Sequence, residues 1–283
     1  YTVVASTGRA SEADYLKGEK KPLTTESSIL ISSSRYLNSA RMRDVVATEM
    51  LRKMGSDLPP AYYIPERSKA FEEVTDYPYI LELLERERKE KPEFAAWLDN
   101  RQIASMNEEN LRDFQPGTLG HEVHCFMCET GFDIDFMFKG DPADDYQYFL
   151  KRFVQNHDIM HMVTGLDVTP VGELALIILS MTAYFDYFSP EFAAELSKYN
   201  GLSIGAQVNQ ALLHYPSTTM VVFDAIELGR GMAREMNTPF FYICWEDHLD
   251  KSIEELRAEF NILNAPAKGA WDWVKEAMGY ETV

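Results

Sequence analysis

The sequence predicts an all-α fold, arranged as a single helical domain. Two observations lead to this class: apolar residues recur at helical spacing in one segment after another, and no stretch alternates convincingly as a β-strand does. Short linkers and the lack of an internal repeat favour one domain. With 283 residues, 46% of them apolar, the chain can bury a substantial core. We expect residues 1–24 to form a flexible arm and residues 25–283 to form the helical domain.

The predicted helices follow one another along the chain. Apolar spacing predicts a long helix over 27–54, broken near Asn38 and stopped by Gly55 and two prolines. The charge run ERERKEK at 85–91 is expected to be a solvated face of the next helix. The remaining helices are predicted over 71–88, 92–100, 119–129, 149–166, 171–188, 190–199, 202–213, 220–236, 252–260 and 270–278.

The composition excludes several classes of protein. The formal net charge of -18 repels phosphate backbones, so we expect no nucleic-acid partner. Three cysteines argue against a disulfide framework and favour a reducing, intracellular compartment. The longest apolar stretch, residues 174–185, is shorter than the ~20 residues of a spanning helix, so we expect no segment to cross a bilayer.

The segment HDIMHMVTGLDVTPVGE at 157–173 places metal-ligand side chains around a helix break. His157 and His161 are four residues apart, which on a helix puts both imidazoles on one face, one turn apart. On an uninterrupted helix Glu173 would lie ~120° away from His161 at 3.6 residues per turn, too far round to join them. A break between the two is therefore required.

The sequence supplies that break. Gly165 can end a helix in the left-handed conformation, Thr169 can cap a new helix, and Pro170 suits its first position. Glu173 then falls in the first turn of a second helix that can fold back toward the histidines. The prediction is a metal site between two consecutive helices.

Asp158 is a further ligand or a group that orients an imidazole, since it points ~100° away from His157. The ligand types suit a divalent metal ion, Zn, Fe or Mn, and leave positions open for substrate, so we expect a catalytic site. The alternative is that the two histidines lie on the surface, that Asp158 decorates a helix, and that Glu173 complements a helix start.

The motif HDxxH, followed by eleven residues and then Glu, resembles the metal-binding signature of the coenzyme Q biosynthesis protein 4 family. His157, Asp158, His161 and Glu173 match it. PGTLG at 116–120, FMCETGF at 126–132, ELGRGMA at 227–233 and WEDHLDKSIEELRAEFNI at 245–262 resemble further landmarks of that family. The resemblance covers roughly residues 25–265. The segment HEVHC at 121–125 departs from the family pattern.

The resemblance implies a metal-dependent enzyme of ubiquinone biosynthesis. The family acts on the ring carbon that carries the carboxyl group of a polyprenylated 4-hydroxybenzoate derivative, replacing carboxylate by hydroxyl. His157, Asp158, His161 and Glu173 would be the catalytic and metal-binding residues of this oxidative decarboxylase, a lyase, because a bound metal can stabilise developing negative charge. Two alternatives stay open: a non-catalytic isoprenoid-binding scaffold, and a relative acting on another phenolic or polyketide acid.

A polyprenyl phenolic substrate needs an apolar cavity and a group that binds its acid. The stretch after Glu173 offers Met181, Tyr184 and Phe185 as cavity walls, with ordinary core packing as the alternative. Arg230 lies between two glycines that let its backbone approach a neighbour, and its guanidinium can bind a carboxylate. A simple salt bridge is the alternative for Arg230.

Three further expectations concern the remaining residues. His121 and His124, with Cys125 and Cys128 nearby, suggest a second metal site, but the string is not HExxH and the sequence favours helix packing instead. Cys244 is expected to be a small buried hydrophobe. We also expect a homodimer, contact with other quinone biosynthesis proteins, and a cytoplasmic location or peripheral contact with the inner membrane, on the matrix side in a eukaryote.

Overall fold

The computed structural model describes residues 34–53, 63–103, 106–131, 134 and 138–279. Within these ranges the chain forms α-helices and short 3-10 helices, and the only β-type pairing is one isolated bridge between Thr118 and Ser252. The all-α prediction is therefore confirmed. The α-helices are α2 (Arg35–Asn38), α3 (Ala40–Leu51), α4 (Ile64–Glu72), α5 (Tyr77–Glu90), α6 (Pro92–Asn100), α7 (Glu108–Leu111), α8 (Leu119–Thr130), α9 (Asp145–Thr164), α10 (Pro170–Tyr187), α11 (Pro190–His214), α12 (Thr219–Glu235), α13 (Ile253–Glu259) and α14 (Asp272–Met278). The 3-10 helices are η3 (Pro216–Thr218), η4 (Phe240–Tyr242) and η5 (Trp245–His248).

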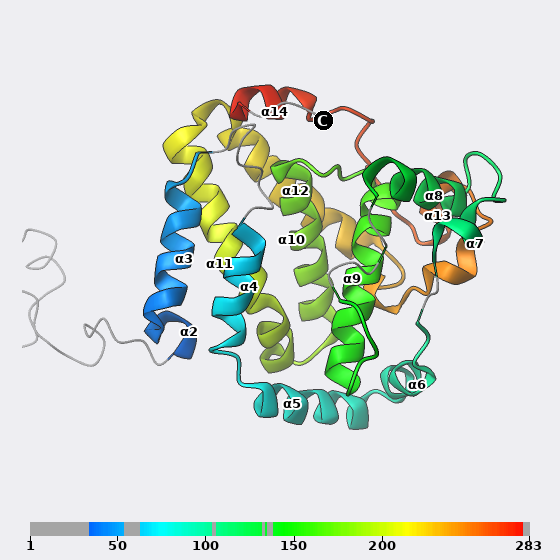
Figure 1. Cartoon of the computed structure of the whole chain (residues 1–283), viewed down its shortest axis with the longest axis horizontal. Coiled ribbons are helices and arrows are strands. Elements are labelled where there is room, and N and C mark those ends of the chain that lie inside the picture. The colour runs from blue at the N-terminus through cyan, green and yellow to red at the C-terminus, as the bar shows by residue number, and fades with distance from the viewer. Residues whose placement is uncertain (1–33, 54–62, 104–105, 132–133, 135–137, 280–283) are drawn as a thin grey trace, which may run out of the picture.

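Helix α10 lies in the middle of the bundle, in contact with α9, α11 and α12 (Figure 1). Helices α3 and α11 lie on one side of it, and α7, α8 and α13 lie beyond α9 on the other side. Its sequence is almost wholly apolar from Leu174 to Ala183 because neighbouring helices cover most of its circumference. The central position of α10 fixes where the residue in its first turn, Glu173, must lie.

The close approach of α12 to α10 depends on Gly229. A Cβ atom built on Gly229 would lie 2.1 Å from the carbonyl oxygen of Ala175, so any larger residue would push the two helices apart. The neighbouring Gly231 has open space around it. The sequence expectation that a glycine beside Arg230 allows a close backbone approach is therefore confirmed, and it is Gly229 that does so.

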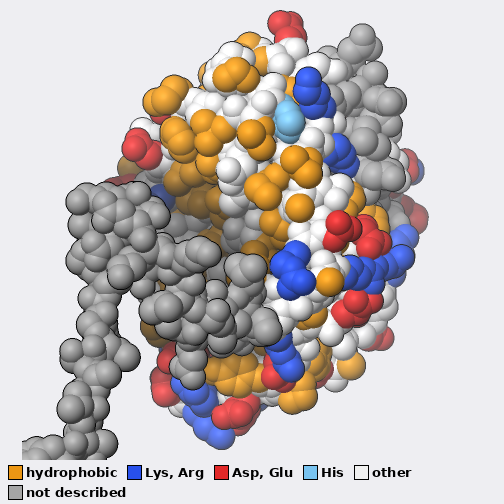
Figure 2. All heavy atoms as spheres, turned by 90° about the vertical axis from the view of Figure 1, so that its left-hand side faces the viewer, with side chains coloured by type: hydrophobic (Ala, Val, Ile, Leu, Met, Phe, Trp, Pro, Cys, Tyr) orange, Lys and Arg blue, Asp and Glu red, His pale blue; other side chains and the backbone are white. Residues whose placement is uncertain are grey.

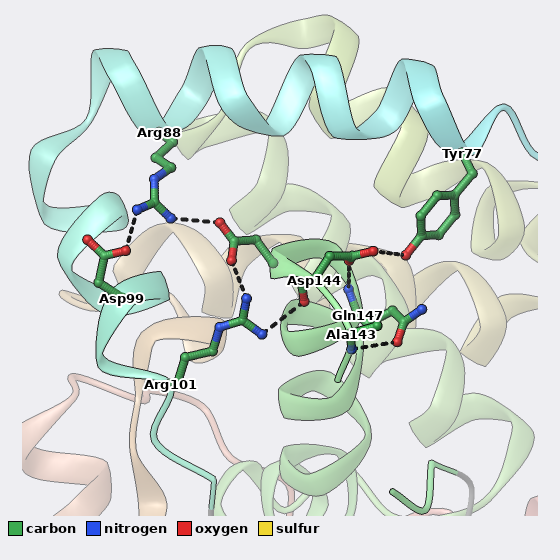
Figure 3. Close-up of polar contacts among 8 residues, drawn as sticks. Tyr77, Arg88, Asp99, Arg101, Ala143, Asp144 and Gln147 are labelled. Atoms are coloured by element: carbon green, nitrogen blue, oxygen red, sulfur yellow. Dashed lines mark hydrogen bonds and ion pairs between the residues drawn. The ribbon is translucent and has the colours of Figure 1, made fainter. Parts of the chain in front are cut away.

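The N-terminal end of α9 is tied to α5 and α6 by polar contacts (Figure 3). Asp144 caps the helix by accepting a hydrogen bond from the backbone of Gln147, and Tyr77 of α5 donates to the same carboxylate at 2.7 Å. Asp145 pairs with Arg88 at 2.7 Å and also with Arg101, which follows α6. These contacts hold the start of α9 in place from two other helices.

Two of the predicted helix assignments need correction. The segment predicted as one helix over 71–88 is divided between α4 and α5, because Asp76 caps a new helix and Pro78 lies in its first turn. The two helices predicted over 190–199 and 202–213 are one helix, α11, which continues through Gly201. The break near Asn38 is confirmed, with Ser39 capping α3, whereas residues 27–33 and 54 lie outside the described residues.

The charge run at 85–91 is not wholly a solvated face. Glu87 is only 1% exposed, and its carboxylate accepts hydrogen bonds from the Lys91 ammonium at 2.6 Å and from the backbone N–H of Ser189 at 2.9 Å. Ser189 is the residue before α11, so Glu87 satisfies one of the free N–H groups at the start of that helix. The expectation failed for Glu87 because its partner comes from a distant part of the chain.

Apolar side chains gather on one face of the molecule, the left-hand side of Figure 1 (Figure 2). Helices α2, α3 and α11 lie on this side. Four of their large apolar side chains are exposed, Leu37, Leu51, Leu212 and Leu213. No helix in the described part of the chain is long and apolar enough to cross a membrane. The predicted arm at 1–24 lies outside the described residues.

Candidate metal centre

His157, His161 and Glu173 meet between α9 and α10. Each offers a ligand atom, and these atoms all lie within 4.8 Å of one another. The Nε2 atom of His161 lies 3.3 Å from Nε2 of His157 and 3.2 Å from Oε1 of Glu173, and Nε2 of His157 lies 3.5 Å from Oε2 of Glu173. Ligand atoms of a tetrahedral ion held at ~2.0–2.1 Å would be separated by about 3.3 Å, so the three side chains fit such an ion.

The predicted helix break brings Glu173 to the histidines. Gly165 ends α9 in the left-handed conformation, with φ +74°, and the Arg257 side chain donates to the carbonyl of Val163 in the last turn of α9 at 2.7 Å. Thr169 caps α10 by accepting from the backbone of Gly172 at 3.1 Å. The chain therefore turns between the two helices as the sequence predicted, and the first turn of α10 faces the last two turns of α9.

A backbone carbonyl orients the His161 ring. Its Nδ1 atom lies 2.6 Å from the carbonyl oxygen of Leu166, which can only accept a hydrogen bond, so Nδ1 carries the proton and donates it. In the neutral ring, Nε2 is then the bare nitrogen, and it points to His157 and Glu173. This arrangement is typical of metal-binding histidines, whose second nitrogen donates to a carbonyl or carboxylate.

The protonation of the site follows from these contacts. Burial raises the pKa of Glu173, but hydrogen bonds and positive charge from His157 and His161 outweigh it and hold the pKa well below the usual range. Burial lowers the pKa of His161, but hydrogen bonding and charge attraction to Glu173 outweigh it, so the pKa is raised. Glu173 is therefore an ionised acceptor at neutral pH, and it favours a cation beside it.

Asp158 lies near the site but not among the three ligand atoms that meet. It does not belong to the group of His157, His161 and Glu173. Burial raises the pKa of Asp158, while the two histidines act in the opposite direction and Glu173 adds to the rise. The prediction that Asp158 is a further ligand or orients an imidazole is therefore not settled by the group of three.

The four predicted substrate-binding residues lie in different surroundings. Tyr184 is buried in an aromatic cluster, and burial holds its pKa above the usual range. Phe185 is 48% exposed, Met181 is partly buried beside Gly201 of α11, and Arg230 is exposed on α12. The structure does not gather these four around one cavity.

Tyr184 lines a small cavity between α9, α10 and η4. The cavity holds about 10 Å³, enough for roughly one water molecule, and its other walls include Phe153, Asn156 and Met160. The ring of Phe153 also packs against His157 with centroids 5.9 Å apart, so one wall residue of this cavity contacts a candidate ligand, although none of the three candidate ligands lines the cavity. Asn156 is 1% exposed and its Oδ1 has no hydrogen-bond partner among the described residues. Asn156 was not predicted as a site residue, although it directly precedes the HDxxH motif.

A larger hollow of about 240 Å³ lies toward the ends of α10 and α12. Its walls include the apolar residues Leu179, Ala183 and Phe240 and the charged residues Asp186 and Arg234. None of the three candidate metal ligands lines it. Ala183 and Phe240 line both hollows.

The chain is similar over residues 61–266 to the family described as "Coenzyme Q (ubiquinone) biosynthesis protein Coq4". This match covers well over half of the chain and includes every residue of the candidate metal centre. The sequence-based resemblance is confirmed.

Curated relatives point to the same family. The chain is 29% identical over 172 residues to a mitochondrial ubiquinone biosynthesis protein coq4 of Penicillium rubens, covering 57% of this chain and 52% of that protein. It is 26% identical over 210 residues to the mitochondrial coq4 of Botryotinia fuckeliana, covering 71% and 70%. The chain spans about half the length of the curated relatives that match first.

One solved structure shares the fold. It is a protein from Nostoc punctiforme PCC 73102 described as a ubiquinone biosynthesis protein, with a TM-score of 0.56 and 19% identity, covering 78% of this chain and 95% of that one. The likeness extends over nearly all of the crystallised protein. At this identity it bears on the arrangement of helices and on nothing further.

Proposed function

Because this chain belongs to the Coq4 family of coenzyme Q (ubiquinone) biosynthesis proteins, we propose that it is a metal-dependent enzyme of that pathway. Its reaction would be the oxidative decarboxylation of a polyprenylated 4-hydroxybenzoate derivative at the carbon that bears the carboxyl group. The observation that carries the proposal is the meeting of His157, His161 and Glu173 at the spacing of ligands around one ion.

With one dioxygen the reaction balances as far as a quinone. The ring would lose its carboxylate as carbon dioxide, gain one oxygen atom at the same carbon, and release the second oxygen as water. Two electrons and two protons from an external hydride donor would then reduce this quinone to the hydroxyl product. A bound metal supplies a Lewis acid for the acid or phenolate of the substrate, and a redox-active metal also assists dioxygen.

The residues of this chain would divide the work. His157, His161 and Glu173 hold the ion, and the carbonyl of Leu166 keeps the His161 ring in its ligating orientation. Asp158, which follows His157 and whose pKa is raised chiefly by burial, would orient a ligand or carry a proton beside the site. Phe153, whose ring packs against His157, would supply an apolar wall beside the ion.

The test is turnover by the purified protein. Loaded with iron, manganese or zinc and given dioxygen and a prenylated 4-hydroxybenzoate labelled in its carboxyl group, it should release labelled carbon dioxide. The variant His161→Ala should release none above background. A metal-loaded, folded protein that leaves the substrate untouched with every metal would contradict the proposal.

A second candidate is a non-catalytic isoprenoid-binding scaffold. It is favoured by the larger hollow, which has mainly apolar walls and is not lined by any of the three candidate metal ligands. In this case the metal would only join α9 to α10, and His161→Ala should lower the melting temperature together with lipid binding. A His161→Ala protein that keeps its metal-free melting temperature but loses turnover would exclude the scaffold.

The location and partners follow the named relatives. Since those relatives are described as mitochondrial, we propose peripheral contact with the matrix side of the inner membrane. The expected homodimer would use the apolar face that carries Leu51, Leu212 and Leu213. Light scattering of the purified protein checks this, because Leu212→Glu with Leu213→Glu should convert a dimer into monomers. A wild-type monomer at high concentration would reject the dimer.

A further inference from the structure

Glu108, His124 and Cys128 form a second cluster of metal-ligand side chains, at the contact between α7 and α8. Their ligand atoms lie within 4.8 Å of one another, and Sγ of Cys128 lies 3.7 Å from Nε2 of His124. The cluster shares no residue with the site between α9 and α10. We propose that these three residues bind a zinc ion, at a site separate from the proposed catalytic centre.

The fold holds the three side chains together for reasons that do not involve a ligand. His124 and Cys128 are four residues apart on α8, so they project from the same face. Helix α7 is capped by Asn107, and its Leu111 is buried in the same core cluster as Leu119 of α8. This packing brings the first turn of α7, and with it Glu108, to that face of α8.

The donor atoms match zinc in type and in spacing. One thiolate, one imidazole and one carboxylate form a mixed set that zinc accepts, and sulfur disfavours magnesium, calcium and manganese. For Zn–S of ~2.3 Å and Zn–N of ~2.0–2.1 Å, a tetrahedral ion would separate sulfur and nitrogen by about 3.6 Å. The observed 3.7 Å between Cys128 and His124 therefore needs almost no adjustment.

The exposure of the cluster bears on its role. Glu108 and Cys128 are exposed and His124 is partly buried, so the ion would lie at the surface. Three protein ligands leave a fourth tetrahedral position to water or to a ligand from outside. An ion bound here joins the short helix α7 to α8, and so it stabilises the connection at 112–118 between them, which includes the start of the PGTLG landmark.

The same helix offers a matched control. Sγ of Cys125 lies 3.7 Å from Nδ1 of His121, so this pair has the same spacing and nearly the same atoms as Cys128 with His124. The Cys125 pair, however, does not belong to any group of three metal-ligand side chains in the described part of the chain. The third ligand, Glu108, is what distinguishes the two pairs.

Cobalt spectroscopy tests the proposal on the full chain. The protein is freed of metal with a chelator, kept reduced with a non-thiol reductant, and titrated with Co²⁺. Sulfur-to-cobalt charge-transfer absorption in the near ultraviolet reports only the second site, because the first site has no sulfur ligand. We expect this absorption in the wild type and in His161→Ala, and we expect equimolar Zn²⁺ to remove it.

The variants identify the ligands. Cys128→Ser should abolish the charge-transfer absorption, Cys125→Ser should retain it, and His124→Ala or Glu108→Gln should weaken Co²⁺ binding on the order of 10- to 100-fold. Circular dichroism of each metal-free variant verifies that the fold is kept. The inference is overturned if the wild type gives no such absorption, if Cys128→Ser retains it, or if Glu108→Gln and His124→Ala both bind as the wild type does.

Discussion

The two ends of α9 use carboxylates in opposite ways. At the N-terminal end, Asp145 is paired with Arg88 and Arg101, so its charge is already neutralised by the protein (Figure 3). At the C-terminal end, Glu173 faces His157 and His161, and among the described residues no arginine or lysine forms an ion pair with it. The first arrangement joins helices permanently, whereas the second leaves a negative charge for a cation to neutralise.

This difference separates a carboxylate that joins helices from a candidate ligand, at the two ends of one helix. An arginine is always charged, so it neutralises the carboxylate that it pairs with at every pH near neutral. An imidazole can instead give up its proton and offer a lone pair to a metal ion, so two imidazoles with a carboxylate make a set of ligands. In the middle of α9 a carboxylate is again paired with an arginine, because Arg152 donates to Glu246 through two contacts of 2.9 and 3.0 Å.

The largest expected effect is the loss of the stability that a bound metal gives at the C-terminal end of α9. Metal at a thousand times its dissociation constant stabilises the folded state by about 4 kcal/mol, and so raises the melting temperature on the order of 10 °C. His161→Ala should abolish most of this rise in differential scanning calorimetry. Arg101→Ala, at the other end of α9, should lower the starting melting temperature yet leave the metal-induced rise intact. An equal metal-induced rise in both variants would show that the two ends of α9 do not differ in metal binding.

The site was predictable from sequence because it is local. All three candidate ligands lie within residues 157–173, and the helix-ending Gly165, the capping Thr169 and the adjacent proline are readable without knowledge of the rest of the fold. The helix spacing of four and the break between the helices determine most of the geometry.

The features that the sequence did not predict depend on contacts between residues that are distant in sequence. Glu108 joins His124 only because α7 packs on α8, which no spacing within α8 reveals. Glu87 was expected in solvent because its partner, Ser189, lies far along the chain. In α10, apolar residues surround the helix, so periodicity could not tell that Tyr184 is buried while Phe185 is 48% exposed.

The buried ion pair in the middle of α9 should produce the largest loss of stability that does not involve metal. Arg152→Ala leaves the largely buried Glu246 without its partner, and we expect a loss of about 4 kcal/mol in the free energy of unfolding, measured by urea denaturation. The double variant Arg152→Met with Glu246→Leu should recover most of that loss because no charge is left unpaired. If the double variant is as unstable as Arg152→Ala, the pairing is not what the single variant disturbs.

The packing of α12 against α10 should contribute less to the free energy of unfolding than this ion pair does, but more than a surface residue does. Gly229→Ala forces a Cβ atom against the carbonyl of Ala175 in α10, and we expect a loss of about 3 kcal/mol in the free energy of unfolding. Gly231→Ala is the matched control: the site is open, and the variant should gain up to about 1 kcal/mol through helix propensity. Because α10 carries Glu173, Gly229→Ala should also weaken metal binding. Equal stability of the two variants would show that α12 does not constrain α10 as described.

The smallest expected effect concerns the pH dependence of Glu87, a paired carboxylate of the helical frame. Burial raises the pKa of this carboxyl, but hydrogen bonds from Lys91 and Ser189 outweigh it, so the pKa is lowered. A lowered pKa means that Glu87 contributes stability above its unfolded value of about 4.3, and that this contribution is lost as the pH falls through the folded value. Glu87→Gln should therefore cost about 1.5 kcal/mol at pH 7, and the gap to the wild type should close below about pH 4. Urea denaturation across this range measures the gap. A gap that stays constant with pH would mean that the amide loses shape or packing rather than charge, and Glu87 would then not belong with the carboxylates that arginine and lysine hold in place.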